Sequence, residues 1–260
     1  MKYDQSDLIF RCEDRIPAYY VSPNGHIKFY TLAGMLLETA AIHASLLGYG
    51  YEDMMRDKVY WVLSRFHITV NSYPLMDQQV IIETWPKGVD RLFFLRDYRM
   101  LSKEGKLLAS ATTAWLVLDG NTGRPKKFED DFNPHELHVK DFHGIEKTPD
   151  KLPQIPEPDS QKSHRAMYSD LDINNHVNAA KYIEWIQDFY DEDVYKSNNV
   201  EEFQINYQLE TRFGEKVDVR MKNQTGDELF DYFEGIRIAD QNSAFRARIK
   251  FGEFQKTVTG

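Results

Sequence analysis

Apolar residues in the first half of the chain change from a helical spacing to the pattern typical of strands. Residues 29–47 carry them at helical spacing, and Gly48 follows as a stop signal. Beyond this helix we expect four long strands rich in Val, Ile, Phe, Tyr, Trp and Thr, at residues 59–70, 78–85, 91–101 and 106–119. Turn signals separate these strands at Tyr73-Pro74, Pro86-Lys87-Gly88 and Lys103-Glu104-Gly105.

The same order recurs in the second half of the chain. A helix is predicted over residues 174–190. Four strands are then predicted over residues 201–213, 215–223, 228–240 and 244–254. The chain therefore reads as one helix-and-strand unit written twice.

The two copies keep a register. Ile68 and Val80 are 12 residues apart, as are Ile205 and Val217, so the first strands of the copies match at an offset of 137 residues. Before the helices, Asn24-Gly25-His26-Ile27 matches Asn174-Asn175-His176-Val177 at an offset of 150. The difference of 13 residues predicts a longer helix-to-strand connection in the first copy, at residues 48–58.

One helix followed by long antiparallel strands is an α+β arrangement, in which the sheet wraps the helix to bury its apolar stripe. Two such units are expected, at residues 1–130 and 164–260. Residues 131–163 between them contain several prolines and are predicted to form an extended strap. The prolines are Pro134, Pro149, Pro153, Pro156 and Pro158.

Composition removes several classes of function. A net charge of -9 and a pI near 5.4 argue against a duplex nucleic-acid binder. The first residues hold no apolar stretch long enough for a signal peptide or a membrane span, so we expect a cytoplasmic protein without membrane contact. A single cysteine, Cys12, excludes an intramolecular disulfide and a multi-cysteine zinc site.

Two local clusters of basic residues occur in this acidic chain. An acidic partner would need such a patch, because the overall field repels it. For either cluster taken alone, the favoured interpretation is a solvated strand edge or a turn. The first cluster is Arg91, Arg96, Arg99 and Lys103, and the second is Arg124, Lys126 and Lys127.

The densest group of polar residues is Tyr168–Asn178, directly before the second predicted helix. Asp172, Asn174 and His176 alternate there and can share one side of an extended segment. The N–H groups at the helix start add partial positive charge that could hold an oxyanion. The alternative is that the Asp and Asn residues only cap the helix and that His176 is an ordinary surface group.

The segment SDLDINNHVNAAKYIEWIQD resembles the active-site segment of the plant plastid acyl-ACP (acyl carrier protein) thioesterases and their bacterial relatives. Its pattern is Asp-x-Asn-x-His followed by Val-Asn and an aromatic-rich helix. LLETAAIHASLLGYG, VYWVLSRFHITVNSYP and ATTAWLVLDGNTGRPKKF resemble further parts of that family. The resemblance implies a tandem double hotdog, with two antiparallel sheets each wrapped around a long helix. The first copy lacks an equivalent of this motif, so we expect the first unit to select the acyl chain and the second to be catalytic.

The resemblance also implies a catalytic set. INYQLETRFGEKV places Glu210 where the family carries a glutamate, so the set is Asp172, Asn174, His176 and Glu210. Thr211 stands where related plant enzymes often have a cysteine, and Cys12 lies beside two acidic residues, which disfavours a reactive thiolate. Either Glu210 or His176 could deprotonate water, and a covalent acyl-Asp or acyl-Glu route stays open.

The activity implied is hydrolysis of fatty acyl-ACP to free fatty acid and holo-ACP, with no metal or organic cofactor. The partner is ACP carrying a phosphopantetheine-linked chain, and a homodimer stays open. A hotdog acyl-CoA thioesterase or hydratase and a non-catalytic acyl-thioester-binding module are the alternatives. HELHVKDFH (His135, His138, Asp141, His143) lacks the spacing of a metal motif. Residues that line an acyl tunnel, or that are plain core, are Met35, Leu36, Thr39, Ala40, His43 and Trp61.

Overall fold

A computed structural model describes residues 8–126, 138–223 and 230–253 of the chain. The chain divides into two compact units. Unit 1 comprises residues 1–27 and 32–149, and unit 2 comprises residues 28–31 and 150–260.

Unit 1 places two helices beside five antiparallel strands in the order β1-β3-β4-β5-β2. The predicted helix and the four predicted strands are all present. The elements are β1 (Phe10–Arg15), the 3-10 helix η2 (Ala18–Tyr20), α1 (Phe29–Leu46), α2 (Tyr51–Arg56), β2 (Val59–Val70), β3 (Gln79–Asp90), β4 (Phe93–Ser102) and β5 (Leu107–Asp119).

Unit 2 repeats this series in the corresponding strand order, β6-β8-β9-β10-β7. The α+β class and the antiparallel pairing predicted from the sequence are confirmed in both units. The elements are β6 (Ser160–Arg165), η4 (Tyr168–Asp170), α3 (Ala179–Gln187), α4 (Glu192–Ser197), β7 (Asn198–Tyr207), β8 (Lys216–Lys222), β9 (Asp231–Arg237) and β10 (Ser243–Glu253).

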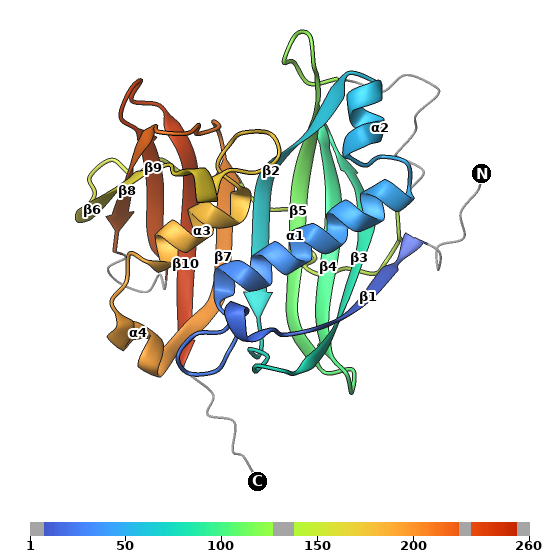
Figure 1. Cartoon of the computed structure of the whole chain (residues 1–260), viewed down its shortest axis with the longest axis horizontal. Coiled ribbons are helices and arrows are strands. Elements are labelled where there is room, and N and C mark those ends of the chain that lie inside the picture. Colours follow the sequence, from blue (N-terminus) through green and yellow to red (C-terminus); the bar gives the residue numbers. More distant parts are fainter. Residues whose placement is uncertain (1–7, 127–137, 224–229, 254–260) are drawn as a thin grey trace. The chain divides into compact units, whose positions relative to one another are not determined.

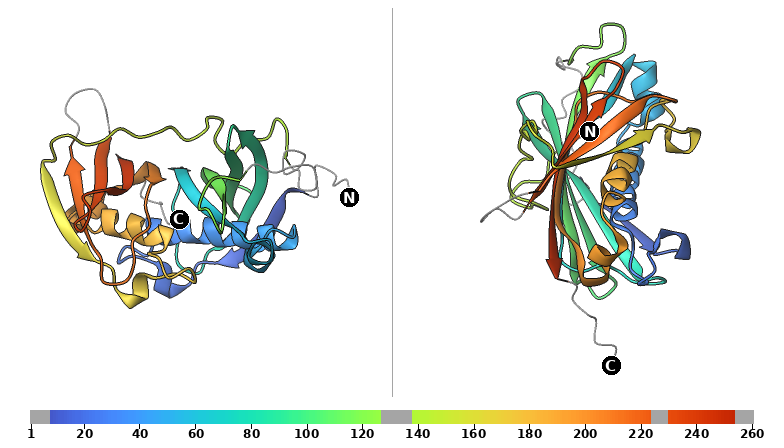
Figure 2. Two further views of the ribbon diagram at one scale, coloured as in Figure 1. Left: turned by 90° about the horizontal axis from the view of Figure 1, so that it is seen from above. Right: turned by 90° about the vertical axis from the view of Figure 1, so that its left-hand side faces the viewer.

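The helices cover one face of the strands within each unit (Figures 1 and 2). In unit 1, Leu32 and Leu36 on α1 and Phe66 and Ile68 on β2 are fully buried. In unit 2, α3 buries an aromatic stripe in which Tyr182 packs on Phe245 with ring centroids 5.2 Å apart. Full burial of each large apolar side chain stabilises the folded state by roughly 1.5 to 3 kcal/mol.

Matching backbone contacts confirm the register of the two copies. An isolated bridge joins His26 to Leu75 in unit 1, and its counterpart joins His176 to Arg212 in unit 2. The first members of these pairs differ by 150 residues and the second by 137, which are the two offsets read from the sequence. The two histidines therefore occupy equivalent positions in equivalent turns.

Most of the extra length expected in the connection at residues 48–58 belongs to helix α1 instead. α1 has 18 residues and α3 has nine, so nine of the thirteen extra residues lengthen the helix itself. α2 and α4, which the sequence reading treated as loop, have six residues each. The loop prediction was wrong because these short helices bury few side chains and leave little apolar periodicity.

Two further element predictions were wrong. The helix predicted over 174–190 is only Ala179–Gln187, because Asn178 caps it by accepting a hydrogen bond from the Ala180 N–H. The described residues of unit 2 therefore contain no long helix. Pro86-Lys87-Gly88 is not a turn but a bulge inside β3, where Gly88 adopts a φ of 130°.

Residues 138–159 form a strap on the strand face away from the helices (Figure 2). In unit 1, the Gly144 N–H donates to Asp97 (3.0 Å) and Arg99 donates to the His143 carbonyl (3.0 Å). In unit 2, the Leu152 N–H donates to Asn206 (2.6 Å) and the Ile155 N–H to Glu234 (3.1 Å). Buried polar side chains thus bind the strap in place. β6 begins at Ser160, within the strap range expected from the sequence.

No helix in the described part of the chain is both long enough and apolar enough to cross a membrane.

Candidate active site

Two loops of unit 2 bring His176 and Glu210 together. One loop runs from η4 to α3, and the other joins β7 to β8. His176 Nε2 lies 3.1 Å from Glu210 Oε2. Glu210 was expected within a strand, but β7 ends at Tyr207, so the carboxylate sits on the loop and remains partly exposed.

Asp172 organises the backbone of the first loop. Its Oδ1 accepts a hydrogen bond from the Asn174 N–H (2.8 Å), and its own N–H donates to the His176 carbonyl (2.9 Å). Asn175 takes a left-handed φ of 60°, which asparagine tolerates well. Asp172 therefore acts on the turn that presents His176, and its carboxylate forms no hydrogen bond or ion pair with the imidazole.

Glu210 is held by two arginines that the sequence reading did not single out. Arg212 Nη2 donates to Glu210 Oε1 (2.6 Å), and Arg237 Nη1 donates to the Glu210 backbone carbonyl (2.8 Å). Arg212 lies two residues after Glu210, so its proximity could have been inferred. Arg237 comes from β9 and needs the fold to bring it near.

The contact between His176 and Glu210 fixes the roles of the two imidazole nitrogens. An ionised carboxylate only accepts hydrogen bonds, so Nε2 carries the hydrogen that faces Glu210. In the neutral ring Nδ1 then holds the lone pair. Nδ1 makes no hydrogen bond within the described residues, so it is available to a water molecule or substrate.

Two of the backbone donors expected to hold an oxyanion are already used. The Val177 N–H donates to the Thr211 carbonyl (2.8 Å) and the Asn178 N–H to the Asp170 carbonyl (2.8 Å). Asn174 is exposed, and its side-chain amide makes no hydrogen bond within the described part of the chain. This amide is the better candidate donor.

Unit 1 holds the corresponding histidine differently. His26 Nδ1 lies 3.0 Å from the backbone carbonyl of Tyr73, which is the counterpart of Glu210 by the offset of 137. Asn24 Oδ1 accepts from Ser22 Oγ (2.6 Å) and from the His26 N–H (3.0 Å). The ring therefore meets a backbone oxygen where His176 meets a carboxylate.

The candidate tunnel residues divide into two groups. Five of them lie on α1 and are buried, namely Met35, Leu36, Thr39, Ala40 and His43. Trp61 belongs to a separate small cluster, where it packs edge-on against Phe94 (5.3 Å) beside Met54. Its indole N–H donates to the Tyr49 carbonyl (3.0 Å). The structure thus brings together the α1 residues, and Trp61 contacts α2 instead.

Other candidate chemistry is weak in the described residues. Burial, followed by the charges of Asp14 and Glu13, raises the pKa of Cys12, which disfavours a thiolate nucleophile. Thr211 is fully buried. No group of three His, Cys, Asp or Glu side chains suited to a metal occurs among the described residues, and His135 lies outside them.

The first basic cluster is not one surface. Arg96 points toward α1, where Nη1 lies 2.9 Å from His43 Nδ1. Arg99 contacts the strap on the other face. Lys103 borders a surface pocket of about 410 Å³. In the second cluster Arg124 and Lys126 are exposed, while Lys127 lies outside the described residues.

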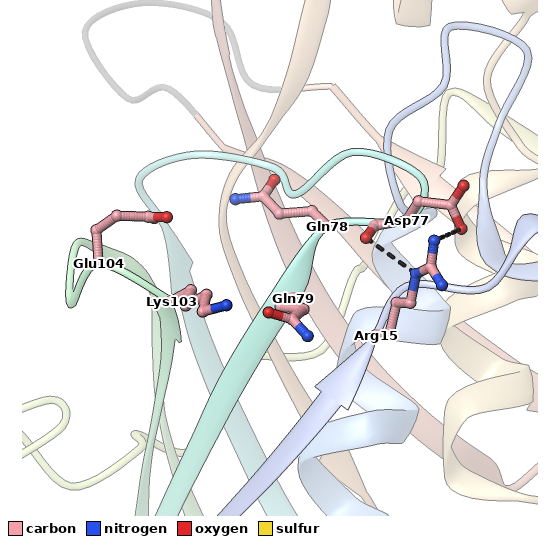
Figure 3. Close-up of a pocket in the computed structure, with 6 residues that line it drawn as sticks. All are labelled: Arg15, Asp77, Gln78, Gln79, Lys103 and Glu104. Atoms are coloured by element: carbon pink, nitrogen blue, oxygen red, sulfur yellow. Dashed lines mark hydrogen bonds and ion pairs between the residues drawn. The ribbon is translucent and has the colours of Figure 1, made fainter.

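The pocket beside Lys103 does not suit an acyl chain. Its six lining side chains are all charged or amide groups, and Arg15 pairs with Asp77 at one side of it at 3.1 Å (Figure 3). It lies in unit 1, whereas the polar groups that could attack a thioester lie on the loops of unit 2.

Comparison with known proteins matches most of the chain to one family. The model of the acyl-ACP thioesterase N-terminal domain matches residues 7–135, and that of the C-terminal domain matches residues 154–253. Oleoyl-acyl carrier protein thioesterase 1 of Arabidopsis thaliana is 26% identical over 219 residues, 78% of this chain. Palmitoyl-acyl carrier protein thioesterase of Cuphea hookeriana is 26% identical over 218 residues, 79% of this chain. The chain spans 60% and 52% of these two relatives' own lengths.

Solved structures show the same likeness. An acyl-ACP thioesterase from Bacteroides thetaiotaomicron matches with a TM-score of 0.85 and 26% identity, covering 96% of this chain and 100% of that one. A 12:0-ACP thioesterase from Umbellularia californica matches with a TM-score of 0.79 and 20% identity, covering 95% of each chain. The second likeness concerns the fold alone.

Proposed function

This chain belongs to the acyl-ACP thioesterase family, and from that premise we propose that it hydrolyses fatty acyl-ACP to a free fatty acid and holo-ACP. Its fold is the hotdog-like fold of that family. The observation that carries the proposal is the 3.1 Å contact between His176 and Glu210 on the loops that hold the family motif.

In the proposed reaction a water molecule attacks the thioester carbonyl. His176 Nδ1 takes one proton from that water, and Glu210 stabilises the resulting imidazolium through Nε2. The Asn174 amide donates to the carbonyl oxygen as negative charge develops on it. The C–S bond then breaks, and the departing thiolate takes the proton from the imidazolium. Asp172 shapes the loop that carries His176.

The carrier protein is proposed to dock on an apolar patch around this site. The patch consists of exposed side chains on or beside the two loops: Met167, Tyr168, Ile173, Leu209 and Phe213. Their unit 1 counterparts by offset are Pro17, Ala18, Pro23, Ser72 and Met76, so the side chains at these positions are larger in unit 2. Arg165 and Arg212 are exposed beside it and complement an acidic carrier.

Division of labour between the units is part of the proposal. Unit 2 carries the His176–Glu210 contact, whereas unit 1 lacks its counterpart and has the longer helix with the buried candidate lining. We assign acyl-chain selection to unit 1 and cleavage to unit 2, each a hotdog copy, with the strap between them. Cytoplasmic location and a homodimer stay predictions.

Hydrolysis of matched acyl-ACP and acyl-CoA panels by the purified chain tests the function. We expect free thiol release from acyl-ACP at a kcat/KM at least tenfold above that for the CoA ester of the same chain length. Comparable or faster hydrolysis of the CoA esters would move the assignment to an acyl-CoA thioesterase. Absence of turnover on both panels would favour the binding module.

A further inference from the structure

Arg96 is a cation placed between the strands and the helix of unit 1. It lies on β4, one residue before Asp97, and strand alternation puts the two side chains on opposite faces. Its Nη1 lies 2.9 Å from His43 Nδ1 on α1 and 3.3 Å from Thr84 Oγ1 on β3. The guanidinium therefore faces the same interior as the buried α1 residues.

No carboxylate of the described residues balances this charge. Within the described residues, no Asp or Glu oxygen lies at ion-pair distance from Arg96, whereas the half-buried Arg246 of unit 2 pairs with Glu234 at 2.7 Å. His43 is neutral, because burial and then the charge of Arg96 lower its pKa to about 3. An enclosed charge without a counter-ion is strongly unfavourable unless other groups stabilise it.

The Arg96 guanidinium also has N–H groups that make no hydrogen bond within the described residues. It has five N–H groups, and in the described part of the chain only Nη1 makes hydrogen bonds from it. The side chain retains some accessible surface, and its remaining nitrogens are not sealed off. These donors can therefore meet an incoming oxygen atom.

The neighbouring polar groups on this face bond to one another instead. Tyr98 Oη lies 3.0 Å from Thr113 Oγ1, and the Trp115 N–H donates to the same hydroxyl (2.7 Å). Phe10 of β1 stacks on His43 with ring centroids 5.3 Å apart. Aromatic and aliphatic side chains therefore surround one guanidinium that has unpaired N–H groups within the described part of the chain. Such an environment suits an acyl chain that is mostly hydrocarbon and carries an oxygen atom.

We propose that Arg96, positioned by His43 and Thr84, binds an oxygen function on the acyl chain: a hydroxyl, keto or carboxylate group. This inference rests on the proposed function for the chain's route into unit 1. A plain alkyl chain would cover the guanidinium without offering an acceptor, which leaves its donors unpaired. Sites built to hydrogen-bond a substrate oxygen discriminate strongly against the analogue that lacks it.

Direct binding of free fatty acids tests the inference without relying on catalysis. The probes are dodecanoic acid, 3-hydroxydodecanoic acid, 12-hydroxydodecanoic acid and dodecanedioic acid, titrated calorimetrically into the full chain. We expect at least one oxygenated probe to bind the wild type tenfold or more tightly than dodecanoic acid. Arg96→Met should abolish that preference, and Arg11→Met, an exposed arginine of the same unit, should keep it.

Equal binding of all four probes to the wild type, or no binding of any, would overturn the inference. So would an Arg96→Met variant that weakens dodecanoic acid as much as the oxygenated probe. Folding is checked by circular dichroism, and Arg96→Gln, expected to lose the same preference, replaces the Met variant should that one unfold. A binding preference in a protein that cleaves no acyl-ACP would refute the proposed function and leave the Arg96 site standing.

Discussion

Tyr73 and Glu210 occupy the same position in the two units, but His26 contacts the backbone oxygen of Tyr73 and His176 contacts the side chain of Glu210. The difference is confined to what each position offers its histidine. Unit 1 gives its imidazole a neutral carbonyl, and unit 2 gives it a carboxylate that can stabilise a proton on the ring.

Glu210→Gln should lower kcat by at least ~10²-fold, because the amide keeps the shape of the side chain but cannot stabilise the imidazolium. His176→Ala should lower kcat by at least as much. Steady-state thiol release from acyl-ACP measures both. Tyr73→Phe and Cys12→Ser are the controls and should stay near wild-type rates. A Cys12→Ser variant without turnover, beside an active His176→Ala, would contradict the assignment.

Asp172→Ala and Asn174→Ala should each lower kcat by at least ~10²-fold, but only Asp172→Ala should also lower the stability of the fold. Asp172 accepts a hydrogen bond within its loop, worth about 1 kcal/mol, so its loss should lower Tm by roughly 2 to 4 °C. The Asn174 side chain bonds to nothing within the described residues, so Tm should not move. Thermal unfolding beside kinetics separates them. Equal Tm losses would show that Asn174 also holds the loop.

Bulkier side chains at Met35, Thr39 or Ala40 should shift the preferred acyl length toward shorter chains. Turnover on the shortest accepted substrate should stay within about tenfold, because only remote binding changes. An acyl-ACP length series measures the shift. His26→Ala is the matched test of the first copy and should change stability without changing kcat. A folded His26→Ala variant as inactive as His176→Ala would mean that both units are catalytic.

Tyr168→Ser and Phe213→Ser should raise KM for acyl-ACP by roughly tenfold while leaving kcat within about twofold, since large exposed aromatics are common anchors of interfaces. Hydrolysis of a small acyl-N-acetylcysteamine thioester should not change. Tyr19→Ser, an equally exposed tyrosine of unit 1, is the control. Parallel losses on the small thioester would place these side chains in catalysis and not in docking.

Unfolding should become easier in mild acid because of His43. Its folded pKa is about 3 and its ordinary value is 6.5, so only the unfolded state binds the proton between these values. Stability is therefore full above pH 6.5 and falls as pH drops toward 3, by about 2 kcal/mol at pH 5. Urea unfolding at pH 7 and pH 5 measures this. His43→Gln should lose that part of the pH dependence, and an unchanged slope would contradict the assignment.

Strong local patterns in the sequence were enough to predict most of the fold. β2 matches its predicted range, Val59–Val70, because twelve residues of strand-forming side chains leave little ambiguity. α3 was predicted too long, because the prediction began the helix at Asn174, whereas Asp172 holds the residues before Asn178 in a turn. α2 and α4 were missed because six residues give too short a pattern to read.

The candidate site was predictable only in part. The family motif led to His176 and Glu210, whose contact the structure shows. The role of Arg237 depends on a neighbouring strand, which no local pattern reveals. Arg96 was grouped with surface residues by composition, although its alternation with Asp97 on β4 already indicated opposite faces.

The nine extra residues of α1 also bear on how such a protein can evolve. Under the proposed division of labour, a duplicated gene lets one copy lengthen or repack its helix while the other preserves the groups proposed to break the bond. Variation in substrate choice then carries little risk to catalysis. A lineage can explore new acyl chains through α1 while selection holds the loops of unit 2 constant.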